Sequence, residues 1–82
     1  MGTRFNIIKE FDKAYKKAIQ DPANWTNQKT PNWGFVEADI WHDLAGEFPR
    51  PTIHEAIESE FDKACLNYEG LELSEIKHIL AH

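Results

Sequence analysis

The segment from Trp33 to Leu44 reads WGFVEADIWHDL, and its interpretation decides between an all-helical fold and a mixed one. Its apolar side chains recur three or four positions apart, on one face of an α-helix: Trp33, Val36, Ile40 and Leu44. The alternative is an α+β fold with a strand near residues 35–42, where apolar and acidic side chains alternate. Because the helical spacing covers the whole segment, we predict a helix here.

Turn-forming residues set the expected ends of this helix. Thr30-Pro31 is typical of a helix start, since a proline at the first helical position loses no needed hydrogen bond. Gly46 is placed to end the helix in a left-handed conformation. Pro49 and Pro51 then prevent the helix from continuing.

On the N-terminal side, residues 4–20 form another predicted helix. Its apolar residues also return every three or four positions; they are Phe5, Ile8, Phe11, Tyr15, Ala18 and Ile19. The helix ends at Asp21, because the residue before Pro22 avoids helical dihedral angles. Residues 21–29 contain turn formers without a period, which predicts a loop with a short turn around Pro22.

On the C-terminal side, Thr52 and Glu55 fit a capping box, in which each side chain satisfies a backbone amide of the other residue. The apolar face of the helix that follows comprises Ile53, Ile57, Phe61, Ala64 and Tyr68, and Gly70 ends it. Ser74 is expected to cap a short C-terminal helix. The sequence therefore predicts one all-α domain over residues 1–82, a compact bundle of three helices plus a short fourth.

The pentapeptide EFDKA occurs twice, as Glu10–Ala14 and as Glu60–Ala64. Both copies lie on predicted helices, and Ile7 and Ile57 are in the same register. Duplication of a helical hairpin would produce such an echo, but repeat architectures need three or more copies. We interpret the echo as a coincidence between two amphipathic helices.

The composition, 41% hydrophobic and 28% charged, gives the chain enough apolar surface to fold. The single cysteine, Cys65, cannot form an intramolecular disulfide, whereas small secreted domains usually need several. The first residues lack the pattern of an export signal. No apolar run approaches the roughly 18 residues that span a bilayer. We therefore expect a cytoplasmic protein without membrane contact.

The net charge of −5 is unevenly distributed along the chain. Residues 1–33 carry six basic and three acidic side chains, whereas residues 34–75 carry two basic and eleven acidic ones. Phosphate contacts need clustered lysine and arginine, so we expect no direct binding of nucleic acid. A basic stripe on the first helix is the one exception, and it comprises Lys9, Lys13, Lys16 and Lys17.

Neither Cys65 nor any histidine belongs to a recognisable catalytic or cofactor motif, so we expect no enzyme and no cofactor. Three pairs of possible metal ligands are four residues apart: His54 and Glu58, Asp39 and Asp43, His78 and His82. Zinc sites need three or four converging ligands, and the sequence shows only pairs. We expect no metal site, and a small metal-binding protein is the third functional hypothesis.

Phe35 falls off the apolar stripe of its helix, which predicts an exposed aromatic ring beside acidic residues. This composition is typical of protein-binding patches. The expected partner-binding residues are Phe35, Asp39, Trp41 and Asp43. The sequence thus favours a small non-enzymatic protein-binding module, an adaptor or inhibitor, whose partner is another protein; a homodimer is left open.

The alternative hypothesis depends on an acidic face formed by Glu55, Glu58 and Asp62, which are spaced three and four residues apart. Carboxylates at such spacing could imitate the phosphates of nucleic acid. On this view the chain is an acidic mimic that inhibits a DNA- or RNA-processing protein.

Overall fold

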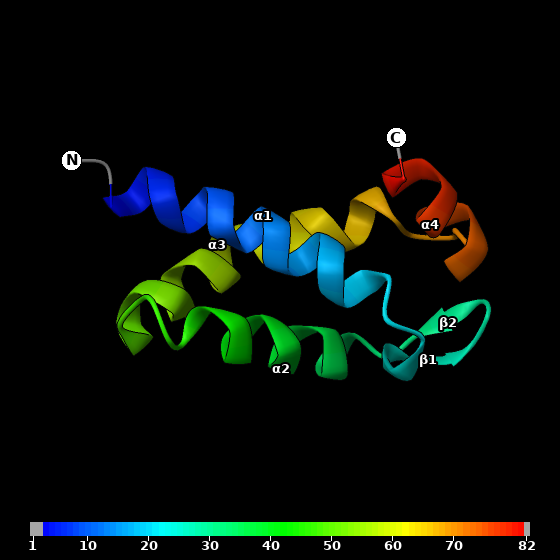
Figure 1. Cartoon of the computed structure of the whole chain (residues 1–82), viewed down its shortest axis with the longest axis horizontal. Helices are drawn as coiled ribbons and strands as arrows, with labels where there is room; N and C mark the ends of the chain where they lie inside the picture. Colours follow the sequence, from blue (N-terminus) through cyan, green and yellow to red (C-terminus); the bar gives the residue numbers. More distant parts are fainter. Residues whose placement is uncertain (1–2, 82) are drawn as a thin grey trace.

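The computed structural model describes residues 3–81, with side chains described from Ile7 onward. Its elements are α1 (Thr3–Ile19), the 3-10 helix η1 (Pro22–Asn24), β1 (Trp25–Asn27), β2 (Thr30–Pro31), α2 (Trp33–Leu44), α3 (Arg50–Asn67) and α4 (Leu73–Leu80) (Figure 1). The predicted helical fold is confirmed, and a small hairpin is added to it. Phe5 and His82, which entered the sequence predictions, lie outside the described side chains.

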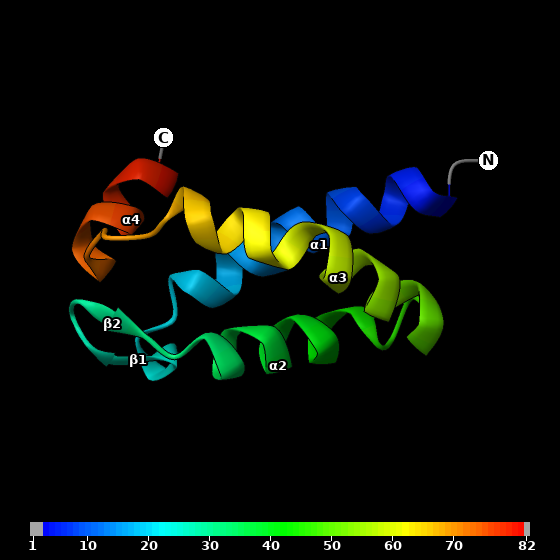
Figure 2. The same ribbon diagram turned by 180° about the vertical axis from the view of Figure 1, so that it is seen from behind.

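The three long helices pack against one another, with α1 contacting both α2 and α3 (Figures 1 and 2). The hairpin and α4 lie together at one end of the molecule, opposite the N-terminus of α1 (Figure 1). A backbone hydrogen bond joins them, because the Leu73 amide donates to the Gln28 carbonyl at 2.9 Å. This end of the molecule therefore brings together the start of α2, the end of α3 and α4.

One hydrophobic core joins all four helices. Its members are Ile7, Phe11, Ala14, Tyr15, Ala18 and Ile19 from α1, Trp25 from β1, Val36, Ile40 and Leu44 from α2, Ile53, Ala56, Ile57 and Phe61 from α3, and Leu73 and Ile76 from α4. Ile8 of the predicted stripes is 43% exposed, while its neighbour Ile7 is buried. Three further stripe residues are only partly buried and pack against the core: Trp33, Ala64 and Tyr68. The other described stripe residues belong to the core. The burial of one helical face supplies most of the stability of such helices.

The alternative strand over residues 35–42 is wrong, because the whole of this range lies within α2. Val36 and Ile40 are fully buried, whereas Ala38 between them is exposed. Burial therefore repeats every four residues and not every two, which is the period of a helix.

The expected start and end of α2 need correction. Pro31 belongs to strand β2, and the helix is capped by Asn32, whose Oδ1 accepts a hydrogen bond from the Phe35 amide at 3.2 Å. Asparagine is among the best N-cap residues, so the helix begins there. Gly46 is not left-handed, since Gly70 alone has a positive φ among residues 3–81. The α-helix ends instead at Leu44, with Ala45 in a right-handed conformation.

Two other helix starts also differ from the prediction. α3 begins at Arg50, with Pro51 in its first turn, so Thr52 lies inside the helix and caps nothing. The Thr52 and Ile53 amides donate to the Pro49 carbonyl at 3.1 and 3.2 Å, and Pro51 has no amide to satisfy, so the first turn forms without a capping box. α4 begins at Leu73, because the Glu75 carboxylate accepts a hydrogen bond from the Glu72 amide at 3.1 Å. Ser74 is consequently a helical residue and not a cap.

The segment predicted as a loop contains the short turn expected at Pro22, and it also forms an antiparallel hairpin. Trp25 pairs with Pro31 and Asn27 pairs with Thr30. The Asn27 side chain closes the turn by accepting a hydrogen bond from the Lys29 amide at 2.8 Å. Strands this short carry no detectable alternation, so the sequence could not reveal them.

Within the described residues, no helix is both long and apolar enough to pass through a bilayer.

Candidate functional site

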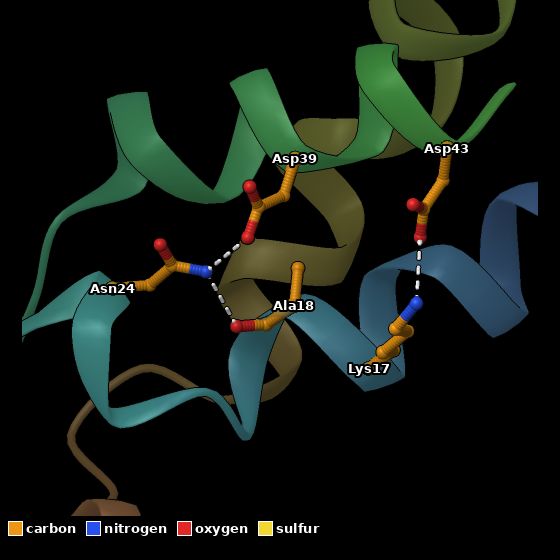
Figure 3. A network of polar contacts seen from close by, with 5 residues as sticks. All are labelled: Lys17, Ala18, Asn24, Asp39 and Asp43. Atoms are coloured by element: carbon orange, nitrogen blue, oxygen red, sulfur yellow. Dashed lines mark hydrogen bonds and ion pairs between the residues drawn. The ribbon is translucent and has the colours of Figure 1, made fainter. Parts of the chain in front are cut away.

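The predicted acidic pair on α2 faces α1 (Figure 3). Asn24 donates from Nδ2 to Asp39 Oδ2 at 2.7 Å and to the Ala18 carbonyl at 2.9 Å. Asp43 lies 3.8 Å from Lys17 Nζ. Both carboxylates therefore have partners within the chain, which reduces what they offer to another protein.

Asn24 is the centre of this junction, and it is the one buried polar residue among the described side chains. Its amide donates to the Asp21 carbonyl at 2.9 Å, and its own carbonyl accepts from the Asn32 amide at 2.7 Å. The Trp25 indole donates to the Ile19 carbonyl at 2.8 Å. These bonds fix the end of α1, the hairpin and the start of α2 relative to one another.

The other two predicted partner residues lie elsewhere on α2. The Trp41 ring is half-buried and contacts His54 of α3, with ring centroids 6.4 Å apart. Phe35 is 56% exposed in the first turn of the helix. The structure thus separates the four residues: the carboxylates face α1, Trp41 faces α3, and Phe35 points to solvent.

The predicted acidic face lies on the outside of α3, where Glu55, Glu58 and Asp62 are all exposed. Glu58 is paired with His54, one turn before it. Leu66, which is 67% exposed, follows Asp62 by one turn on α3, and exposed Glu69 lies in the turn just beyond the helix. A large apolar side chain is therefore set between carboxylates.

A hollow of about 440 Å³ opens beside Leu66, and we call it the Trp33–Leu66 hollow. Its lining residues are Trp33, Asp62, Cys65, Leu66 and Glu69. Trp33 is half-buried and packs edge-to-face on Phe61, with centroids 6.4 Å apart and planes at 89°. The hollow thus has an aromatic and aliphatic surface with two carboxylates at its border.

These carboxylates lack cationic partners. Among side chains 7–81, no lysine, arginine or histidine lies within ion-pair distance of Asp62 or Glu69. Lys63, the nearest cation in sequence, pairs with Glu60 at 4.0 Å. The charge at the border of the hollow is consequently available to an external cation.

Cys65 separates the hollow from the core, and its thiol is not an activated nucleophile. Burial raises the pKa of the Cys65 thiol above its ordinary value. Burial also raises the pKa of Tyr15, whose ring packs against Phe61 and Tyr68 at centroid distances of 6.1 and 5.7 Å. Reactive cysteines need a lowered pKa, so this environment does not favour thiolate chemistry.

The basic stripe of α1 borders an open groove against α2, and its lysines are largely paired. Lys13 lies 3.8 Å from Glu10, Lys16 lies 2.9 Å from Asp12, and Lys17 pairs with Asp43 as described above. Paired lysines lose much of the positive field that attracts phosphate. The stripe is a weaker anion site than its sequence suggests.

Two of the three predicted pairs of metal ligands lie within the described residues, whereas the third includes His82, which lies outside them. His54 and Glu58 form an ion pair, while Asp39 and Asp43 bind Asn24 and Lys17. Across the described part of the chain, no three side chains of histidine, cysteine, aspartate or glutamate are grouped to hold a metal ion.

Sequence reasoning missed Trp33, Leu66 and Glu69 as candidate site residues. Trp33 was assigned to the apolar stripe of α2, and it does contact the core through Phe61. Leu66 had a detectable signal, because it follows Asp62 by four residues and so shares the acidic face and not the apolar one. An apolar residue on the polar face of a helix was the pattern to look for.

Comparisons of the chain with protein-family models, with curated protein sequences and with solved structures find no significant match.

Proposed function

We propose that this chain is a small non-enzymatic protein-binding module, an adaptor or inhibitor, that contacts its partner through the Trp33–Leu66 hollow. The observation that carries the proposal is the 67% exposure of Leu66 beside the half-buried ring of Trp33. Tryptophan, tyrosine and arginine side chains supply most of the energy of protein interfaces, inside a polar border, and Trp33 is the residue of this kind in the hollow. Asp62 and Glu69 form such a border here.

The chemistry of the hollow supports binding over catalysis. Cys65 is its only nucleophilic side chain among the described residues, and burial raises the pKa of its thiol. A nucleophile needs an adjacent base or a lowered pKa to react. The hollow offers two carboxylates and no histidine beside this thiol.

The acidic mimic is the second candidate, because the exposed carboxylates of α3 favour it. Glu55, Glu58 and Asp62 lie in a row on one face. Two features count against it: Glu58 is paired with His54, and Leu66 interrupts the row with an apolar side chain. The basic groove of a nucleic-acid-binding protein is built to contact phosphates, and an exposed leucine does not imitate a phosphate. Protein binding is therefore the better-supported function.

The test compares the wild-type chain with Leu66→Ser and with a matched control, Ile79→Ser, in capture of proteins from native lysate. Ile79 is 51% exposed on α4, so both substitutions remove one exposed aliphatic side chain. We expect at least one protein to be retained by the wild type and by Ile79→Ser and to be lost with Leu66→Ser. Identical capture by all three chains would contradict the proposal.

Salt separates the two candidates. Exposed charges are screened over about 10 Å at 0.1 M salt, so a mimic would release its target as salt rises and would be indifferent to Leu66→Ser. A partner held by Trp33 and Leu66 would resist moderate salt and depend on the leucine.

A further inference from the structure

We infer that the Trp33–Leu66 hollow takes an arginine side chain of the partner protein, whose guanidinium group lies on the tryptophan ring and against the two carboxylates. This inference rests on the proposed function and names the group of the partner that enters the hollow. It follows from the three kinds of surface that line the hollow: an aromatic ring, an aliphatic side chain and a carboxylate border.

The apolar part of the lining suits the stem of a long side chain. Trp33 comes from the first turn of α2, whereas Cys65 and Leu66 come from the last turn of α3. Trp33 is only half-buried, although it packs edge-to-face on Phe61, so part of its surface is open to a ligand. The methylene groups of arginine can cover such apolar surface while the charged end stays at its border.

The carboxylate border favours a cationic occupant. Asp62 lies on α3 and Glu69 in the turn beyond it, and both line the hollow. Neither has an ion-pair partner among side chains 7–81. An apolar group in the hollow would remove these carboxylates from water without a partner, which costs free energy. An acidic group would be repelled by them, whereas a cation would be attracted.

Arginine fits this lining better than lysine does. The guanidinium group is planar and weakly hydrated, so it can stack on an aromatic ring and donate hydrogen bonds from its edge at the same time. Its five N–H donors can serve two carboxylates. The lysine ammonium is a compact, strongly hydrated charge and has no flat surface to place on the ring of Trp33.

A second copy of this chain is a poorer source of the arginine. The chain has two arginines, Arg4 and Arg50, which lie in the first turns of α1 and α3. The hollow is at the other end of α3. Insertion of Arg50 into the hollow of another copy would therefore be a head-to-tail contact, which produces open chains of molecules unless a ring closes. A separate protein meets no such constraint.

The test measures the binding of three small probes to the isotope-labelled full chain by nuclear magnetic resonance at low salt. The probes are the acetylated amides of arginine, lysine and citrulline, and citrulline has nearly the shape of arginine without its charge. We expect the arginine probe to shift the Trp33 indole resonance and the Leu66 and Glu69 amides. It should bind about tenfold more tightly than the citrulline probe, the combined effect of a cation–π contact and an exposed ion pair, with the lysine probe between them.

A double variant, Asp62→Asn with Glu69→Gln, tests the carboxylates. Its control is Glu47→Gln with Glu55→Gln, which changes the net charge equally at exposed positions that do not line the hollow. We expect about fivefold weaker binding of the arginine probe by the test variant, and little change by the control. Circular dichroism confirms that both variants keep their helices.

The variant Trp33→Leu tests the aromatic ring. It keeps an apolar residue against Phe61 and removes the flat surface on which a guanidinium group stacks. We expect the arginine and lysine probes to bind this variant with similar affinity, as read from the Leu66 amide.

Equal affinity for the arginine and citrulline probes, a preference for lysine, or equal weakening by the two double variants would overturn the inference. Self-association of the chain that is abolished by Arg50→Gln would also overturn it, because a second copy would then supply the arginine.

These failures are distinguishable from failure of the proposed function. If lysate capture depends on Leu66 while the chain shows no preference for the arginine probe, the proposed function stands and the partner enters the hollow with another group. If capture does not depend on Leu66, the proposed function is wrong whatever the probes show.

Discussion

Tyr15 carries a buried hydroxyl group without a nitrogen or oxygen partner, and the Cys65 thiol beside it is a weak hydrogen-bonding group. The residue is 2% exposed, and its ring lies against Phe11, Phe61 and Tyr68. A buried polar group without a partner costs about 1–3 kcal/mol, and removing it recovers part of that cost. We expect Tyr15→Phe to raise the free energy of unfolding by about 1 kcal/mol, measured by urea denaturation. A loss of stability would show that the hydroxyl has a partner.

Tyr15 also predicts the response to alkaline pH. Burial raises its pKa above the ordinary value of 10.0, so the folded state keeps a proton that the unfolded state releases. Ionisation of Tyr15 therefore leaves the free energy of unfolding unchanged below about pH 10 and lowers it as the pH rises further, by up to about 1.4 kcal/mol per pH unit. Urea midpoints across this range should fall less steeply for Tyr15→Phe than for the wild type. Parallel slopes would contradict this assignment.

Asp39 was predicted to contact a partner, and its contact with Asn24 gives it a role inside the fold. Asp39→Ala removes one of the two acceptors of the buried Asn24 amide, so we expect a loss of about 1–3 kcal/mol in unfolding free energy. Asp43→Ala is the control, because an ion pair at the surface contributes about 0–1 kcal/mol. Equal losses of unfolding free energy from the two substitutions would show that the hydrogen bond between Asn24 and Asp39 contributes no more than the surface ion pair.

At the scale of elements, the connection between α3 and α4 depends on Gly70. Its φ of +83° is unfavourable for residues with a β-carbon, although an added Cβ would meet no atom within 4 Å. We expect Gly70→Ala to cost about 1 kcal/mol of unfolding free energy through backbone strain alone. Gly46→Ala is matched to it, because Gly46 is also uncrowded but has no positive φ, and it should be neutral or slightly stabilising.

The helices could be predicted because one buried face imposes a period on the sequence, as Val36, Ile40 and Leu44 illustrate. Their starts were misplaced where two local signals competed: Asn32 caps α2 although Thr30-Pro31 precedes it. The hairpin was missed because its strands are too short to alternate. A local sequence pattern therefore predicts which face of a helix is buried better than it predicts where the helix begins and ends.

The candidate site was only partly predictable, because spacing within one helix can be seen in the sequence and contacts between elements cannot. The acidic face of α3 follows from spacing within one helix, and Glu55, Glu58 and Asp62 are exposed there. Asp39 lies half-buried against Asn24, fifteen residues earlier, and no local pattern encodes that contact. The Trp33–Leu66 hollow is lined by residues of both α2 and α3. It therefore forms only when these helices pack together, and neither helix alone could predict it.

At the scale of the whole molecule, the two EFDKA copies occupy similar environments. Phe11 and Phe61 are both buried against Tyr15, and the lysine of each copy pairs with its glutamate, at 3.8 and 4.0 Å. Amphipathic helices that share a core select the same residues at the same positions. Coincidence therefore stays our interpretation, and duplication stays the alternative.

The distribution of charge over the molecule explains why one surface is proposed for binding. The lysines at positions 13, 16 and 17 of α1 are paired, whereas Glu55 and Asp62 on α3 and Glu69 beyond its end have no ion-pair partner among side chains 7–81. The exposed apolar side chain on that face is Leu66. Charge and apolar surface therefore coincide at the Trp33–Leu66 hollow.

The most direct test of this account is a nuclear magnetic resonance titration of the isotope-labelled chain with a partner whose capture depends on Leu66. We predict that the largest chemical-shift changes on addition of the partner occur at the Trp33 indole and at the backbone amides of residues 62–69. Shifts concentrated instead at Phe35, Asp39 and Asp43, or along α1, would contradict it.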